Sequence, residues 1–190
     1  MTETSANRIT RIDRDGKLST FIEPSNCAHG LAYDPKGRLI AAELGCNGGK
    51  PQIGVLAPMR ATLADSYQGQ PMMFMNDLVA DRKGGIYFTE SGIVNVTESI
   101  DVPRKGRYGT YYLNPDGRVI KLTGVEQITF PSGIILSPDE KTLYLNDLNQ
   151  EEIWAYEVAS NGQISNRKVL GRTETFSMRW TWARPTKFKC

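Results

Sequence analysis

The chain has 190 residues, with 23 basic and 21 acidic side chains, a net charge of +2 and 39% hydrophobic residues. This length is sufficient for one domain with a sizeable core. The balanced charge, with no basic stripe in residues 1–170, argues against a nucleic-acid-binding surface, and no apolar run approaches the roughly 18 residues of a membrane span.

The first predicted element is a hairpin over residues 7–23, whose two apolar or alternating runs flank the turn Arg14-Asp15-Gly16. Residues 29–43 predict a hairpin of a second type. It has a small or polar pair, an apolar run, a turn rich in Pro, Lys, Gly or Asp, and a second apolar run that ends in an acid. Residues 52–65 predict a weaker hairpin of the first type. Asp-Gly between such runs is a strong hairpin signal, because both central turn positions tolerate positive φ.

The two types of hairpin then alternate along the chain. The second type recurs over residues 76–90 and 132–147, and the first type recurs over 109–124 and 153–170. The copies of the second type begin at residues 29, 76 and 132, so their starts are 47 and 56 residues apart. A period of this size with strands in each unit is typical of a β-propeller.

One hairpin of each type makes four strands, which is one propeller blade. Helical periodicity of useful length is absent. We therefore predict an all-β fold, a partial β-propeller over residues 1–170 with about three to four blades of four-stranded antiparallel sheet. Residues 171–190 contain two tryptophans and five basic residues without a turn signal, so we expect a basic and aromatic tail outside the repeat. A basic and aromatic tail can bind nucleic acid or an acidic surface, but the interpretation we favour is a readthrough or truncation product of a longer chain.

The cysteines are three in number, at positions 27, 46 and 190, with irregular spacing and no Cys-x-x-Cys pair. This pattern predicts free thiols in a reducing compartment. The polar N-terminal segment lacks the apolar stretch of a signal peptide. A cytoplasmic location follows as an expectation, provided that this N-terminus is the natural one.

Three polar residues, His29, Asn76 and Ser132, open the three copies of the second hairpin. The innermost strand of each blade runs beside the channel of a propeller, so these side chains are predicted to converge on an axial pocket. An Asn side chain offers a carbonyl oxygen, which suits Ca²⁺ or Mg²⁺. The only histidine of the chain can serve as a general base or acid.

Each of these residues also has a structural interpretation. A histidine before glycine at a strand start often forms a turn or a hydrogen bond, and Asn76-Asp77 can cap a turn. Acids that recur in or beside the turns are predicted to be turn formers: Asp34, Asp81 and Asp139. Acids also recur where the second strands end, and periodicity alone leaves their role open: Glu43, Glu90 and Asp147.

Three segments, residues 27–43, 63–90 and 128–147, resemble the family of gluconolactonases, senescence marker protein (regucalcin) and luciferin-regenerating enzymes. The resemblance covers roughly residues 7–170. It implies a six-bladed β-propeller that binds one divalent metal, Ca²⁺ or Zn²⁺, in its central channel. It also implies hydrolysis of sugar lactones, with the metal acting as Lewis acid on the lactone carbonyl.

The resemblance assigns roles to four residues of this chain. It implies that His29, Asn76 and Asp77 bind substrate, with Asp77 orienting its neighbour, and that Asn76 and Ser132 contact the metal. Ser132 stands where the family usually has a metal-ligating Asn. The family's Glu-Gly-Pro motif is absent, and its catalytic Asp would lie beyond residue 170, outside the matching region.

The sequence therefore supports a metal-dependent hydrolase of sugar lactones that is weak or inactive in this chain. The alternative is a non-catalytic propeller fragment that acts as a binding or calcium-handling module. A homodimer that pairs the open edges of the partial propeller is a further expectation.

Overall fold

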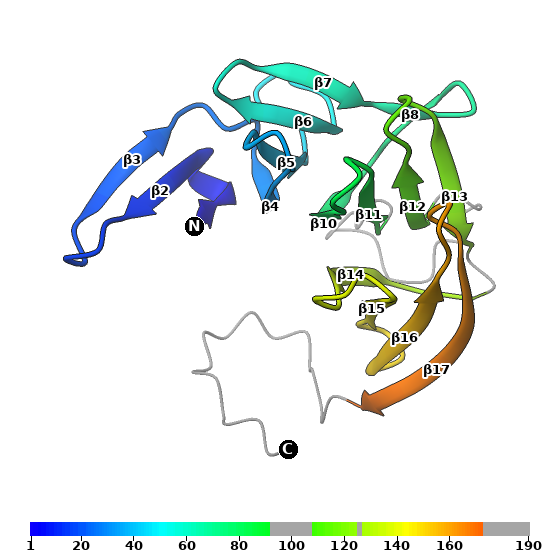
Figure 1. Cartoon of the computed structure of the whole chain (residues 1–190). Helices are drawn as coiled ribbons and strands as arrows, with labels where there is room; N and C mark the ends of the chain where they lie inside the picture. The colour runs from blue at the N-terminus through cyan, green and yellow to red at the C-terminus, as the bar shows by residue number, and fades with distance from the viewer. Residues whose placement is uncertain (92–107, 125–126, 173–190) are drawn as a thin grey trace.

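The computed structural model describes residues 1–91, 108–124 and 127–172 of the chain (Figure 1). These residues form strands, turns and loops, with one short 3-10 helix over Thr4–Ala6 and no α-helix. The predicted all-β fold is confirmed. Of the tail predicted over residues 171–190, residues 173–190 lie outside the described residues. No helix in the described part of the chain is long and apolar enough to cross a membrane.

Four antiparallel sheets follow one another along the chain, and we call them the first to fourth blades. The first blade contains β1 (Thr2–Glu3), β2 (Arg8–Ile12) and β3 (Leu18–Ile22). The second contains β4 (Ala28–Tyr33), β5 (Leu39–Glu43), β6 (Gln52–Ala57) and β7 (Ala61–Ala64). The third contains β10 (Met75–Ala80), β11 (Ile86–Glu90), β12 (Gly109–Leu113) and β13 (Val119–Thr123). The fourth contains β14 (Pro131–Leu136), β15 (Thr142–Asp147), β16 (Glu152–Val158) and β17 (Ile164–Arg172).

The four blades fan around a common centre, as in a partial propeller (Figure 1). The strands β4, β10 and β14 face this centre, whereas β7, β13 and β17 lie at the periphery. Strand β10 contacts both β4 and β14. The hairpins of the second sequence type are therefore the inner halves of three blades, and those of the first type are the outer halves.

The apolar cores lie between the blades. One cluster joins the first and second blades around Ile9 and Leu39. A second joins the second and third blades around Ile40 and Phe88, and a third joins the third and fourth blades around Tyr87 and Trp154. The alternation of each strand thus places one set of side chains against the preceding blade and the other against the next.

The three inner hairpins share an irregularity at the same place. Their register shifts between Ala28 and Leu31, between Met75 and Leu78, and between Pro131 and Ile134. At each shift two residues face one residue of the neighbouring strand, as in a β-bulge. The bulges contain the polar pairs His29-Gly30, Asn76-Asp77 and Ser132-Gly133. A bulge bends its strand and changes the direction of its side chains, and bulges are frequent beside active sites.

The recurring acids have structural roles. The carboxylates of Asp34, Asp81 and Asp139 accept hydrogen bonds from backbone N–H groups two residues later, at distances of 2.9 to 3.1 Å. They are turn formers, as predicted. The acids that end β5, β11 and β15 bind the segment just before the inner strand of their own blade. Glu43 binds Asn26, Glu90 binds Met73, and Asp147 binds Thr129.

A disulfide joins Cys27, just before β4, to Cys46, in the loop after β5. The prediction of free thiols is therefore wrong for these two residues, and Cys190 lies outside the described residues. Their Cα atoms are 5.8 Å apart because the pairing of Ala28 with Glu43 brings together the chain segments just beyond the two strands. Disulfides persist in oxidising environments, so the bond removes the argument for a reducing compartment.

Candidate axial site

The three inner bulges bring polar groups to the centre of the fan. His29 is exposed, Asn76 is 6% exposed, and Ser132 is half-buried. The His29 Nδ1 atom lies 2.9 Å from the carbonyl oxygen of Asn76. Ser132 is joined to the same region by Thr89, whose hydroxyl donates to the Ser132 carbonyl oxygen at 2.7 Å. The structure thus brings His29 and Asn76 into contact and connects Ser132 through β11.

The contact with Asn76 fixes the tautomer of His29. A carbonyl oxygen only accepts hydrogen bonds, so the Nδ1 atom carries the hydrogen in this contact. In the neutral imidazole the Nε2 atom is then the acceptor. The exposed ring of His29 therefore offers its Nε2 atom as a hydrogen-bond acceptor when it is neutral.

The Asn76 side chain is oriented by Ser91. Its Nδ2 atom donates to Ser91 Oγ at 3.1 Å, and this hydroxyl donates in turn to the Pro131 carbonyl oxygen. Because the Ser91 proton is used by Pro131, Ser91 must accept from Asn76, which places the amide nitrogen toward Ser91. The amide oxygen of Asn76 consequently faces away from Ser91.

Asp77 connects the three inner strands. Its carboxylate accepts from the backbone N–H of Leu78 at 2.9 Å and from that of Ile134, on β14, at 3.3 Å. On the other side, Gly30 of β4 approaches so closely that a Cβ atom there would lie 2.5 Å from Asp77 Oδ1. Only glycine fits at position 30 without displacing the carboxylate.

The pKa of Asp77 is raised above its usual value. Burial of the carboxylate is the largest cause. The hydrogen bonds from Leu78 and Ile134 and the nearby His29 act in the opposite direction. Carboxyl groups with a raised pKa cluster at functional sites.

The residues described at the axis do not complete a metal site. They contain no group of three or more His, Cys, Asp or Glu residues that could hold a metal ion. Asn76 and Ser132 offer neutral oxygens, and the carboxylate of Asp77 is engaged by two backbone N–H groups. Ca²⁺ takes about six to eight oxygen ligands, commonly including carboxylates.

The sequence did not single out Ser91 as a site residue. It follows Glu90, and the residues that follow the equivalent acids in the other inner hairpins are Leu44 and Leu148. A serine where the repeat otherwise has leucine was the available signal. Its role became visible only when β10, β11 and β14 were placed side by side.

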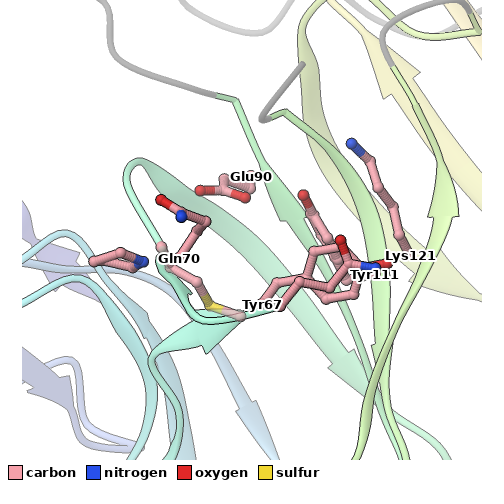
Figure 2. Close-up of a pocket in the computed structure, with 8 residues that line it drawn as sticks. Tyr67, Gln70, Glu90, Tyr111 and Lys121 are labelled. Carbon is pink, nitrogen blue, oxygen red and sulfur yellow. The ribbon is translucent and has the colours of Figure 1, made fainter. Parts of the chain in front are cut away.

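A hollow of about 160 Å³ lies away from the axis, on the third blade. Figure 2 shows Tyr67, Gln70, Glu90, Tyr111 and Lys121 around it. None of the four residues predicted from the sequence lines this pocket. One wall is the hairpin of β8 (Ser66–Tyr67) and β9 (Gln70–Pro71), which was absent from the predicted elements. Its Gln68-Gly69 turn has positive φ at both residues.

Known proteins resemble this chain in sequence and in fold. Residues 1–180 match the model of the SMP-30/Gluconolactonase/LRE-like region. A gluconolactonase from Zymomonas mobilis is 29% identical over 182 residues, which cover 87% of this chain and 50% of that protein. The chain thus spans about half the length of this curated relative.

Solved structures show the same fold. A gluconolactonase from Xanthomonas campestris superposes with a TM-score of 0.74 at 24% identity, over 88% of this chain and 56% of that chain. A calcium-binding protein described as regucalcin, from Agrobacterium tumefaciens, superposes with a TM-score of 0.64 at 17% identity, over 88% of this chain and 53% of that chain.

Proposed function

This chain belongs to the SMP-30/Gluconolactonase/LRE-like family, and we propose that its axial site binds sugar lactones as part of a metal-dependent lactone hydrolase. The observation that carries the proposal is the convergence of His29, Asn76 and Asp77 at two neighbouring bulges. The similarity to a gluconolactonase of Zymomonas mobilis supports the choice of substrate class. A lactone offers several hydroxyl groups and one ring ester, which suit a pocket with a few convergent polar groups.

Hydrolysis of a lactone requires water to add to the carbonyl carbon and the ring C–O bond to break, which gives a hydroxy acid. In the proposed site the Nε2 atom of His29 takes a proton from the attacking water and returns one to the leaving alkoxide. The Asn76 side chain, held by Ser91, binds and orients the substrate. The described residues do not complete the ligand set of a divalent metal, so no step is assigned to it.

The incomplete ligand set predicts slow turnover by this chain. We expect hydrolysis of glucono-δ-lactone by the purified 190-residue chain, with Ca²⁺ or Zn²⁺ added, to exceed the spontaneous rate only slightly. The substitutions His29→Ala and Asn76→Ala should remove this excess, whereas Asn161→Ala, in an exposed turn, should keep it. Equal activity of the His29 and Asn76 variants and the parent chain would overturn the proposal. Robust turnover by the parent chain would instead contradict the expectation of a weak enzyme.

A non-catalytic binding or calcium-handling module is the second candidate. The described residues contain no group of three or more His, Cys, Asp or Glu side chains, so they do not favour calcium handling over lactone hydrolysis. Calorimetric titration with Ca²⁺ separates the two functions. Tight binding without lactone hydrolysis supports the module, and weak binding together with slow hydrolysis supports the lactonase.

We also propose that two copies associate through the ends of the fan. Apolar side chains are exposed on the first blade at Ile12 and Leu18, and on the fourth blade at Ile135 and Val169. Exposed apolar surface of this kind and open sheet edges favour association. A monomer in size-exclusion chromatography at high protein concentration would contradict this proposal.

A further inference from the structure

Two buried hydroxyl groups near the end of β11 lie between the inner strands of the third and fourth blades. They belong to Thr89 and Ser91, which are both 0% exposed. Thr89 donates to the Ser132 carbonyl oxygen of β14 at 2.7 Å, and Ser91 donates to that of Pro131. Each hydroxyl also accepts a hydrogen bond from β10. The Ser91 hydroxyl orients the Asn76 side chain, which leaves the role of Thr89 to be explained.

The Thr89 hydroxyl is connected to His29 through one peptide unit. Its Oγ1 atom accepts from the Asp77 backbone N–H at 3.1 Å. This N–H belongs to the same peptide unit as the Asn76 carbonyl, whose oxygen lies 2.9 Å from His29 Nδ1. A trans peptide unit is planar, with its C=O and N–H groups on opposite sides, so the orientation of one group fixes that of the other. Thr89, in the core, therefore fixes the carbonyl that His29 contacts.

The three hydrogen bonds of this chain of groups all point the same way. A carbonyl oxygen only accepts and a backbone N–H only donates, so His29 Nδ1 must donate to the Asn76 carbonyl. For the same reason the Asp77 N–H donates to Thr89, whose hydroxyl donates to Ser132. The series runs from β4 of the second blade across β10 to β14 of the fourth blade (Figure 1). Hydrogen bonds aligned in such a series polarise and strengthen one another.

We propose that Thr89 is a positioning residue of the axial site, which holds the His29 ring in the Nδ1–H tautomer through the Asn76–Asp77 peptide unit. The ring nitrogen of a histidine that carries the hydrogen is set by the hydrogen bond that this ring makes. Thr89 orients and polarises the carbonyl that accepts this bond. The Nε2 atom then stays free of hydrogen in the neutral ring. The inference rests on the proposed function only for the use of Nε2 in proton transfer.

A neighbouring threonine separates this role from a purely structural one. Thr110 of β12 is also 0% exposed, and it pairs directly with Thr89 of β11. Its hydroxyl has no hydrogen-bond partner among the described residues. The substitution Thr110→Val therefore alters the same part of the core but breaks no hydrogen bond to the axis. It is the matched control for Thr89→Val, which keeps the shape of the side chain and removes the hydroxyl.

The test is NMR of the ring nitrogens of His29 in the ¹⁵N-labelled full chain, where the only histidine gives an unambiguous signal. At about pH 8.5 the ring is neutral, since the ordinary pKa of histidine is about 6.5, and the two nitrogen shifts report the tautomer. We expect the Nδ1–H form to predominate in the parent chain. Thr89→Val should lower the ratio of the Nδ1–H to the Nε2–H form by about threefold, because aligned bonds strengthen one another by roughly 10 to 30%.

Two variants should keep the ratio of the parent chain: Thr89→Ser, which retains the hydroxyl, and Thr110→Val. A parent chain in which the Nε2–H form predominates overturns the proposal, and this measurement needs no variant to fold. The proposal is also overturned if Thr89→Val keeps the parent ratio, if Thr89→Ser loses it, or if Thr110→Val changes it equally. No lactone is present in these measurements. Failure of the proposed function, seen as unchanged hydrolysis by His29→Ala, is therefore a separate result.

Discussion

The second and fourth blades anchor the same part of the repeat in different ways. In the fourth blade the buried carboxylate of Asp147 accepts hydrogen bonds from the backbone N–H groups of Thr129 and Phe130, at 2.8 and 3.1 Å. In the second blade the buried carboxylate of Glu43 receives side-chain amides only, from Asn26 at 2.6 Å and Gln52 at 2.9 Å. Its Oε1 atom has no hydrogen-bond partner. Glu43 and Asp147 occupy equivalent positions in the repeat, but only Asp147 binds backbone N–H groups of the segment before its inner strand.

Other groups take over the anchoring in the second blade. The disulfide Cys27–Cys46 ties the segment before β4 to the loop after β5. The Cys27 backbone N–H also donates to Asn7 Oδ1, in the first blade, at 2.7 Å. In the second blade, the disulfide and the contact with the first blade thus hold the segment before the inner strand. In the fourth blade, the Asp147 carboxylate holds the equivalent segment. Substitutions at the two places should reveal this difference.

The largest effect is expected for Asp147→Ala. It leaves the half-buried N–H group of Thr129 and the buried N–H group of Phe130 without their acceptor, which should lower the free energy of unfolding by about 3 to 4 kcal/mol. Equilibrium unfolding in urea measures the change. Asp139→Ala, at an exposed turn, is the control and should cost no more than about 1 kcal/mol. Equal losses in the two variants would show that the buried carboxylate is not the anchor.

The second effect concerns the disulfide. Cys27→Ser removes a cross-link between residues 19 positions apart, which should lower the free energy of unfolding by about 3 kcal/mol in the chain-entropy account. The same urea series measures it. A thiol reductant should bring the parent chain to the level of the variant and leave the cost of Asp147→Ala unchanged. A parent chain that is indifferent to the reductant would contradict the assignment.

The third effect concerns the β10–β11 hairpin of the third blade, which lies between the second and fourth blades. Ser91→Ala removes the hydroxyl that joins Asn76 to Pro131, and it should lower the free energy of unfolding by about 1 to 3 kcal/mol. It should also change the NMR signals of the Asn76 side-chain amide, because their acceptor is lost. Ser160→Ala, at an exposed turn, is the control. Unchanged Asn76 signals in Ser91→Ala would mean that Ser91 does not orient this side chain.

The smallest effect is expected for Glu43→Gln, within about 1 kcal/mol at any pH because the shape and most hydrogen bonds are kept. Burial raises the pKa of Glu43, against the hydrogen bonds from Asn26 and Gln52 and the charge of Arg60. The contribution of Glu43 to stability is therefore full at pH values below the ordinary carboxyl pKa of 4.5 and is lost as the pH rises through the raised value. Relative to the parent chain, the variant should become more stable between pH 4 and pH 7. A difference that falls over this range would give the wrong sign.

The fold was predictable because its signals are local. The Asp-Gly and Asn-Gly turns and the alternating runs fix each hairpin, and the turn acids Asp34, Asp81 and Asp139 bind as their positions indicated. The β8–β9 hairpin escaped because its strands have two residues each, too few for a periodic signal.

The site was predictable only as a set of positions. The polar pairs at 29, 76 and 132 were recognised by their recurrence, but the bulges that redirect them depend on the register between two strands. The Cys27–Cys46 bond and the contact of Ser91 with Asn76 join residues through three-dimensional proximity, which spacing does not encode. The acids at the strand ends, Glu43, Glu90 and Asp147, likewise bind residues that only the folded structure brings near them.

The placement of the apolar cores between the blades has a consequence for how the molecule comes apart. The second and third blades are covered by apolar clusters on both faces, whereas the described residues cover one face of the first and fourth blades. Stability is then a sum of nearest-neighbour couplings, as in a one-dimensional array of repeats. Under such coupling the outermost blades open first, and the second and third blades open last. The strand that holds Asn76 and Asp77 therefore belongs to the inner pair of blades, which is the most cooperative unit of the described residues.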